Sequence, residues 1–222
     1  MNTHSLHTDT PPHDNLLVQM QTTGDPTQAV ILCHGRFASG ADMMNLVGQL
    51  DVPENTLVLA PTASGNQWYP NRFIVERDDN QPQLDSALEV IGELIRFCRK
   101  EYEITSDQIT LVGFSQGACL VTDFISRNPQ PFKAVGILSG GLIGADWEIA
   151  DTDFTGSLED TPVYLGCDEA DPHIPYDRVE VTNKVLTSLE ADVESCRYQD
   201  LGHSVHPDAI AFLNKAVSKE IG

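Results

Sequence analysis

The sequence predicts an α/β fold, in which a mostly parallel, doubly wound sheet carries helices on both faces. Five short runs of apolar and β-branched residues are continuous rather than alternating, which is typical of strands buried on both faces. These runs cover residues 29–34, 56–61, 109–114, 134–140 and 162–167. Segments with helical periodicity lie between them, and this alternation favours parallel strands joined by crossover helices. The length of 222 residues suits one domain with a full core.

The other elements follow in chain order. Residues 1–14 are polar and are expected to form a flexible leader before a single domain over residues 15–222. Residues 16–21 alternate loosely, as an edge strand does. Ser39 and Asp42 can cap a helix over residues 41–50. Further helices are predicted over residues 82–102, 118–125, 176–189 and 207–218, with a last strand over residues 195–199.

Two long stretches are expected to be irregular, and both bear on how open a site can be. Residues 62–80 contain three aromatic side chains, and a loop of that length in one domain is usually functional or disordered. Residues 141–161 are acidic and are interpreted as a surface insertion. Neither stretch is long enough to predict a large cap domain.

The composition excludes several classes of partner. The chain has 33 Asp and Glu against 13 Lys and Arg, a net charge of −20, which argues against nucleic acid and against stable association with an anionic membrane. No apolar run reaches the length of a membrane span. Five cysteines without C-x-x-C spacing indicate reduced core thiols and a cytoplasmic protein. No H-E-x-x-H or Cys/His cluster occurs, so no metal is expected.

The acidic excess also suggests a hypothesis about salt. Unpaired surface carboxylates repel one another at low ionic strength, and salt screens that repulsion. A salt-tolerant protein, even one from a saline habitat, is one interpretation. An ordinary acidic cytoplasmic protein is the other.

Gly113, Ser115 and Gly117 form a G-x-S-x-G pentapeptide between a predicted strand and a predicted helix. That context is the one a nucleophile elbow requires, because the serine sits in a strained turn at the carboxyl end of a strand. Both flanking positions must then be small, and both are glycine. A glycine-rich turn with an idle serine is the structural alternative.

A serine nucleophile needs a histidine base and a carboxylate that orients the base. The loop after residues 162–167 offers Asp168, Glu169 and Asp171. Asp171 is favoured because it lies nearest the next helix and Pro172 and Pro175 stiffen the backbone there, and Asp168 is the alternative because it lies nearer the strand end. After the last strand, His203 is favoured over His206, which looks like a helix-entry residue. The chain order Ser, Asp, His is that of the α/β-hydrolases.

An oxyanion intermediate needs two backbone N–H donors. One should be Gln116, which follows the serine. The second should come from the loop after the first buried strand, where Arg36 is the first candidate and Phe37 the next.

Aromatic residues are candidates for the substrate pocket. Trp68, Tyr69 and Phe73 either line an acyl pocket together with Phe37 or anchor their long loop to the core. His173 is a further pocket candidate without an assigned role.

With these motifs in place, the chain resembles the bacterial carboxylesterase/phospholipase group of α/β-hydrolases, which is related to acyl-protein thioesterases. The matching pieces, spread over nearly the whole chain, are Leu-Cys-His-Gly-Arg at 32–36, Gly-Phe-Ser-Gln-Gly-Ala at 113–118, Asp-Pro-His-Ile-Pro at 171–175 and Gly-His at 202–203. The resemblance implies an α/β-hydrolase fold, a triad of Ser115, Asp171 and His203, and oxyanion donors at Arg36 and Gln116. It also implies cofactor-free hydrolysis of short to medium acyl esters and, as in many members, a homodimer. The family usually has glycine at the position of Phe37.

The sequence therefore predicts a serine carboxylesterase that hydrolyses small-molecule, short-chain esters through an acyl-enzyme. An acyl-protein thioesterase or a lysophospholipase with the same triad is the alternative within the class, since only pocket shape separates them. A non-catalytic binding protein on the hydrolase fold is the alternative of another class. Turnover of p-nitrophenyl esters distinguishes the enzymes from the binding protein.

Overall fold

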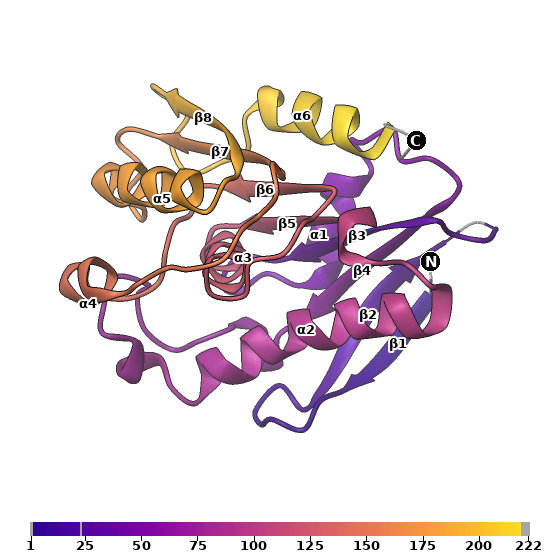
Figure 1. Cartoon of the computed structure of the whole chain (residues 1–222). Coiled ribbons are helices and arrows are strands. Elements are labelled where there is room, and N and C mark those ends of the chain that lie inside the picture. The colour runs from indigo at the N-terminus through magenta and orange to yellow at the C-terminus, as the bar shows by residue number, and fades with distance from the viewer. Residues whose placement is uncertain (1, 23, 219–222) are drawn as a thin grey trace.

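The computed structural model describes residues 2–22 and 24–218, and these residues contain an eight-stranded, mostly parallel sheet (Figure 1). The strand order is β1-β2-β4-β3-β5-β6-β7-β8. The β1/β2 and β2/β4 pairs are antiparallel, and the other five neighbouring pairs are parallel. The strands are β1 (Asn2–His7), β2 (Asn15–Gln21), β3 (Gln28–Cys33), β4 (Thr56–Thr62), β5 (Ile109–Phe114), β6 (Ala134–Leu138), β7 (Pro162–Asp168) and β8 (Asp192–Tyr198).

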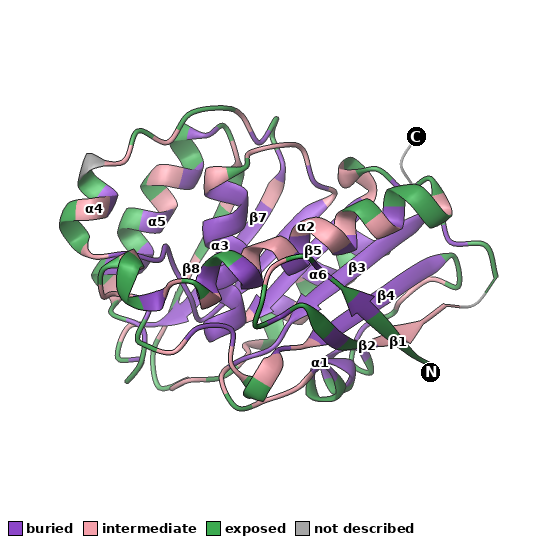
Figure 2. Cartoon of the chain, turned by 90° about the horizontal axis from the view of Figure 1, so that it is seen from below, coloured by how far each residue is buried: buried purple, intermediate pink, exposed green. Residues whose placement is uncertain are grey.

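Helices cover both faces of this sheet. The helices are α1 (Gly40–Val47), α2 (Gln83–Tyr102), α3 (Gln116–Arg127), α4 (Asp146–Asp151), α5 (Tyr176–Ser188) and α6 (Pro207–Ser218). Apolar side chains of α1 and α6 pack on one face, and those of α2, α3 and α5 form a larger core on the other. The central strands are buried throughout, as Figure 2 shows in purple. The predicted fold class is confirmed, and the described residues contain no large cap domain.

The expectation of a flexible leader is wrong for residues 2–14. β1 pairs with β2 along its whole length, so β1 rather than β2 is the edge strand. Five of its six side chains are exposed and only Leu6 is buried, which explains why its sequence carries no strand pattern. Farther on, His13 is buried, and its N–H donates to Ser86 Oγ of α2 over 2.9 Å. Met1 lies outside the described residues.

The interpretation of residues 141–161 as an irregular surface insertion is also wrong. The stretch contains α4 and buries four apolar side chains in the core, those of Leu142, Ile143, Ile149 and Leu158. The acidic residues between them obscured this apolar pattern. The remaining elements match their predicted positions to within a few residues. Among the described helices, none is long and apolar enough to cross a membrane.

Residues 62–80 are irregular as predicted, apart from the short turns η1 (Ser64–Asn66) and η2 (Arg77–Asn80). An ion pair ties the far end of this stretch to α3. Asp123 is fully buried, and both of its oxygens accept hydrogen bonds from Arg77, at 2.8 and 2.7 Å. Its Oδ1 atom also accepts from Arg127 Nε at 3.0 Å. A buried carboxylate is stable only with such partners, so this contact positions the loop.

Two buried histidines hold the near end of the same stretch. His34 Nε2 accepts the Ala63 N–H at 3.0 Å, and His13 Nδ1 accepts the Ser64 N–H at 3.1 Å. A ring nitrogen that accepts a hydrogen bond carries no proton, so both imidazoles are neutral. Burial lowers the pKa of His13 and of His34 below the ordinary value of 6.5.

Candidate active site

Ser115 occupies the tight turn between β5 and α3. Its φ of 54° and ψ of −117° lie in a region that residues other than glycine rarely adopt. A Cβ atom on Gly113 would lie 2.3 Å from the Gly117 carbonyl oxygen, and one on Gly117 would lie 2.1 Å from that of Cys33. The expectation that both flanking positions must be small is therefore confirmed. The close approach lets the turn project the serine from the carboxyl end of β5.

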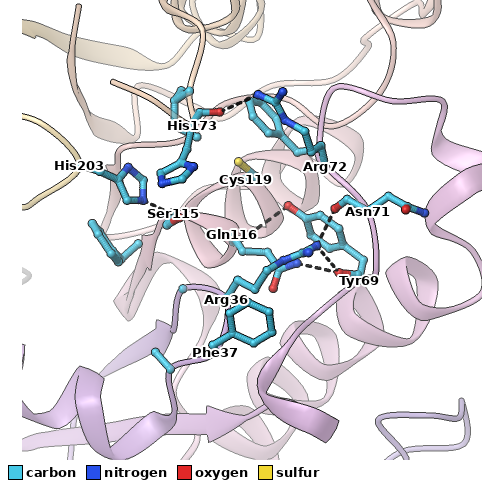
Figure 3. A pocket seen from close by; sticks show the side chains of 15 residues that line it. Arg36, Phe37, Tyr69, Asn71, Arg72, Ser115, Gln116, Cys119, His173 and His203 are labelled. Carbon is cyan, nitrogen blue, oxygen red and sulfur yellow. Dashed lines mark hydrogen bonds between the residues drawn. The ribbon is translucent and has the colours of Figure 1, made fainter. Parts of the chain in front are cut away.

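His203 and Asp171 complete a hydrogen-bonded chain with this serine, and Figure 3 shows the His203 ring beside Ser115. His203 Nε2 lies 2.8 Å from Ser115 Oγ, and His203 Nδ1 lies 2.7 Å from Asp171 Oδ2. A carboxylate can only accept, so Nδ1 carries the proton and Nε2 is left to accept the serine hydroxyl. The other oxygen of Asp171 accepts the N–H groups of His173 and Ile174, at 2.8 and 3.1 Å. The arrangement can remove a proton from Ser115.

The competing acid Asp168 has a different role. Its side chain is buried and accepts the N–H groups of Ala170, Leu201 and Gly202. These hydrogen bonds, led by the one from Ala170, hold the pKa of Asp168 below its ordinary value. Asp168 therefore fixes the loop that carries His203.

The competing base His206 also lies outside this chain of contacts. Its ring stacks on Tyr198 with centroids 3.8 Å apart, and its carbonyl accepts the Ala209 N–H at the start of α6. Its interpretation as a helix-entry residue agrees with this placement.

The two N–H groups predicted to bind an oxyanion border the serine. The loop after β3 reaches Ser115, because a Cβ atom on Gly35 would lie 3.3 Å from Ser115 Cβ. The Phe37 N–H donates to Asn66 O at 2.7 Å and is therefore occupied. In residues 2–22 and 24–218, no protein group accepts from the N–H of Arg36 or of Gln116. The geometry thus favours Arg36 over Phe37.

The side chains of Arg36 and Gln116 form hydrogen bonds with the backbone of residues 68–71. Gln116 Nε2 donates to Tyr69 O at 2.8 Å, and its Oε1 accepts the Trp68 N–H at 2.9 Å. Arg36 Nη2 lies 2.7 to 2.9 Å from the carbonyl oxygens of residues 69, 70 and 71. The sequence indicates only backbone roles for Arg36 and Gln116, because side-chain partners so distant in sequence leave no local pattern.

A cavity of about 420 Å³ opens above Ser115. Tyr69 and Phe73 line it, as does Phe37, whose side chain is 76 % exposed and whose φ is +66°. Trp68 does not line the cavity; it is fully buried, and its Nε1 donates to His34 O at 2.8 Å. The pocket expectation is wrong for Trp68, which instead anchors its loop. His173 lines the cavity.

The cavity is also lined by residues that the sequence did not indicate as pocket residues. Three of them are polar or carry a thiol: Asn71, Arg72 and Cys119. Asn71 and Arg72 belong to a loop whose path the sequence pattern could not indicate. Cys119 lies on the first turn of α3, where its apolar surroundings suggested only core packing, and burial raises the pKa of its thiol to about 12.

The described residues contain no group of three or more His, Cys, Asp or Glu side chains that could hold a metal ion.

The parallel sheet, the strained turn at Ser115 and the Ser–His–Asp contacts define an α/β-hydrolase. Residues 15–221 match the family model for phospholipase/carboxylesterase. The chain belongs to this phospholipase/carboxylesterase family.

The chain is similar to known proteins over nearly its full length. The chain is 25 % identical to Esterase YpfH of Escherichia coli K12 over 209 residues, which covers 90 % of this chain and 85 % of that one. It is 25 % identical to Acyl-protein thioesterase 1 homolog 1 of Dictyostelium discoideum over 222 residues, covering 93 % and 96 %. The crystal structure of a phospholipase/carboxylesterase from Dyadobacter fermentans DSM 18053 superposes with a TM-score of 0.84 at 31 % identity, covering 98 % of this chain and 100 % of that one.

Proposed function

We propose that the protein is a serine carboxylesterase that hydrolyses short-chain esters through an acyl-enzyme. The observation that carries this proposal is the pair of contacts on His203, 2.8 Å from Ser115 Oγ and 2.7 Å from Asp171 Oδ2. In this geometry Ser115 is the nucleophile, His203 the general base and Asp171 the group that orients the base.

The proposed reaction proceeds in two halves. Ser115 Oγ attacks the ester carbonyl carbon while His203 Nε2 takes the hydroxyl proton, and the carbonyl oxygen becomes an oxyanion. The free N–H groups of Arg36 and Gln116 stabilise that charge. The intermediate collapses to the acyl-enzyme, and the leaving alcohol takes the proton from His203. Water then attacks the acyl group by the same steps and releases the carboxylic acid and Ser115.

The size of the cavity supports a small substrate. A volume of about 420 Å³ lies near the lower end of ligand pockets, which span roughly 300 to 1,000 Å³. Phe37, Tyr69 and Phe73 supply apolar surface for a short acyl chain or a small alcohol.

Free thiols at all five cysteines support a cytoplasmic setting.

A panel of p-nitrophenyl esters from acetyl to palmitoyl tests the proposal. We expect kcat/KM to peak at the short-chain end, and Ser115→Ala to abolish turnover without changing the circular dichroism spectrum. A peak at long acyl chains would instead favour a thioesterase or lysophospholipase pocket. Absence of turnover across the panel by folded protein would favour a binding protein on the hydrolase fold.

A further inference from the structure

The charge of the cavity differs from the charge of the protein. The chain as a whole has a net charge of −20, yet the described residues that line the cavity include no Asp or Glu. They do include two arginines and two histidines: Arg36, Arg72, His173 and His203. The two guanidinium groups give this cleft a positive charge in an otherwise acidic protein, which favours anionic ligands over neutral ones.

The two arginines are not equally available. Arg36 already donates to three carbonyl oxygens, as described above. The exposed Arg72 donates one long hydrogen bond, 3.4 Å from Nη2 to His173 O. Despite the acidic composition, no ion pair formed within the described part of the chain includes Arg72. Its guanidinium can therefore serve a ligand.

The backbone that presents Arg72 is fixed. The buried side chain of Asn80 accepts the Asn71 N–H at 2.8 Å and donates to Arg72 O at 3.1 Å. A guanidinium on an ordered turn loses less freedom when it binds a ligand than one on a loose loop. Its planar N–H groups match a carboxylate or a phosphate.

The position of Arg72 indicates which part of an ester it faces. The leaving alcohol takes its proton from His203 and so lies beside that ring. The His173 ring packs edge-on against His203, with centroids 4.8 Å apart, and Arg72 contacts His173. In Figure 3, Arg72 and His173 lie on one side of the pocket, and Arg36 and Phe37 lie on the other. Arg72 thus borders the alcohol side.

We infer that Arg72, together with His173, binds an anionic group on the alcohol part of the substrate. The inference rests on the proposed esterase function and names its substrate class: short-chain acyl esters of alcohols that carry a carboxylate or a phosphate. Arg72 is then the residue that determines specificity for the leaving group.

The test compares esters with and without an anionic group on the alcohol. The first pair is 4-carboxyphenyl butyrate and its uncharged analogue 4-carbamoylphenyl butyrate. The second pair is 1-butyrylglycerol 3-phosphate and 1-butyrylglycerol. For each pair, the ratio of kcat/KM for the anionic ester to that for the neutral ester is measured in three proteins: the wild type, Arg72→Gln and the control Arg99→Gln.

Arg99 is a matched control because it is exposed and lies near the carboxyl end of α2, from which the chain leads into the amino end of β5. It therefore lies away from Ser115, and its replacement removes the same charge. We expect Arg72→Gln to lower the ratio about tenfold for at least one pair, as loss of a charge-assisted hydrogen bond does, and Arg99→Gln to leave it unchanged. The pair that responds identifies the anion as a carboxylate or a phosphate.

An unchanged ratio in Arg72→Gln would overturn the inference. An equal fall in Arg99→Gln would do the same, since overall charge rather than a local contact would then explain the preference. A wild-type protein that hydrolyses none of the four esters would refute the proposed function instead. The anion site would then be judged by calorimetry on the Ser115→Ala protein with both phenyl esters, where equal affinities would overturn the inference.

Discussion

His203 Nε2 lies 2.8 Å from Ser115 Oγ, although 88 residues separate the two in the chain. Ser115 follows β5, and His203 follows β8, which lies three strands away at the edge of the sheet. The loop after β8 must therefore cross the ends of β6 and β7 to reach the serine. Asp168, at the end of β7, accepts the N–H groups of Leu201 and Gly202 from this loop. The Asp168 carboxylate thus holds the loop that carries His203, and the Asp171 carboxylate holds the His203 ring.

The two aspartates are expected to respond differently to replacement by asparagine. Asp171→Asn should lower kcat on the order of 10³- to 10⁴-fold, because an amide favours the wrong imidazole tautomer and cannot stabilise the imidazolium. Asp168→Asn should lower activity less than Asp171→Asn does but should lower the free energy of unfolding more. The two carboxylate oxygens of Asp168 accept three N–H groups, and the single oxygen of an asparagine side chain cannot accept all of them. Steady-state kinetics and urea unfolding of both variants check this expectation. Equal, small losses of activity would show that neither aspartate orients the base.

Gly117→Ala should destabilise the protein by about 3 kcal/mol or more, since its Cβ atom would lie 2.1 Å from a backbone oxygen of β3. Gly24→Ala is the comparison: unlike Gly117, Gly24 has a positive φ, +78°, but nothing lies within 4 Å of a Cβ atom there. Its cost should be about 1 to 2 kcal/mol, the strain of the left-handed conformation alone. Free energies of unfolding from urea titrations provide the comparison. Similar values for the two variants would mean that the turn at Ser115 can relax.

The fold and the Ser–His–Asp contacts could be predicted because each leaves a local signal. Continuous apolar runs mark the buried strands, and G-x-S-x-G fits only a narrow range of turns. The loops that hold Asp171 and His203 follow strands that the same patterns locate. Position in the loop favours Asp171 over Asp168, and Asp171 is the one that contacts His203, but nothing in the sequence indicates that Asp168 holds the loop of His203.

The features that could not be predicted depend on contacts between distant residues. β1 is an exposed edge strand whose polar side chains carry no pattern, and its place is set by pairing with β2. The clamp formed by the side chains of Arg36 and Gln116 joins segments about 30 to 50 residues apart. The sequence alone leaves open whether Trp68 lines the pocket or anchors its loop. The hydrogen bond from its indole N–H to His34 O, which joins distant segments, places it as an anchor.

Acid should weaken the protein through its two buried histidines. Because burial lowers the pKa of His13 and of His34 in the folded state, the unfolded chain binds more protons once the pH falls below about 6.5. Their contribution to stability is therefore present above pH 6.5 and is lost as the pH falls below it. The loss is at most about 1.4 kcal/mol per pH unit for each imidazole.

Thermal midpoints between pH 7.5 and 5 in wild type, His13→Gln and the control His7→Gln check this expectation. His7 is exposed on β1, so its replacement should leave the slope of midpoint against pH unchanged. His13→Gln should flatten that slope, because the side chain can no longer take up a proton. The same slope in all three proteins would show that His13 does not titrate on unfolding.

Salt should stabilise the protein. An excess of 33 acidic over 13 basic residues cannot all be paired, so surface carboxylates repel one another at low ionic strength. Raising NaCl from 0.01 M to 1 M shortens the screening length from about 30 Å to about 3 Å and relieves that repulsion. We expect the thermal midpoint to rise with NaCl and the activity to persist. A steady fall of both would refute salt tolerance.

Covalent labelling with a serine-directed fluorophosphonate, followed by peptide mapping, tests the central proposal most directly. The strained turn and the neutral His203 acceptor should make Ser115 far more reactive than the other serines, so the adduct should map to Ser115. Loss of esterase activity should follow the labelled fraction, and His203→Ala should suppress labelling. An adduct on another serine, or full activity in a protein labelled completely at Ser115, would contradict the assignment of Ser115 as the nucleophile.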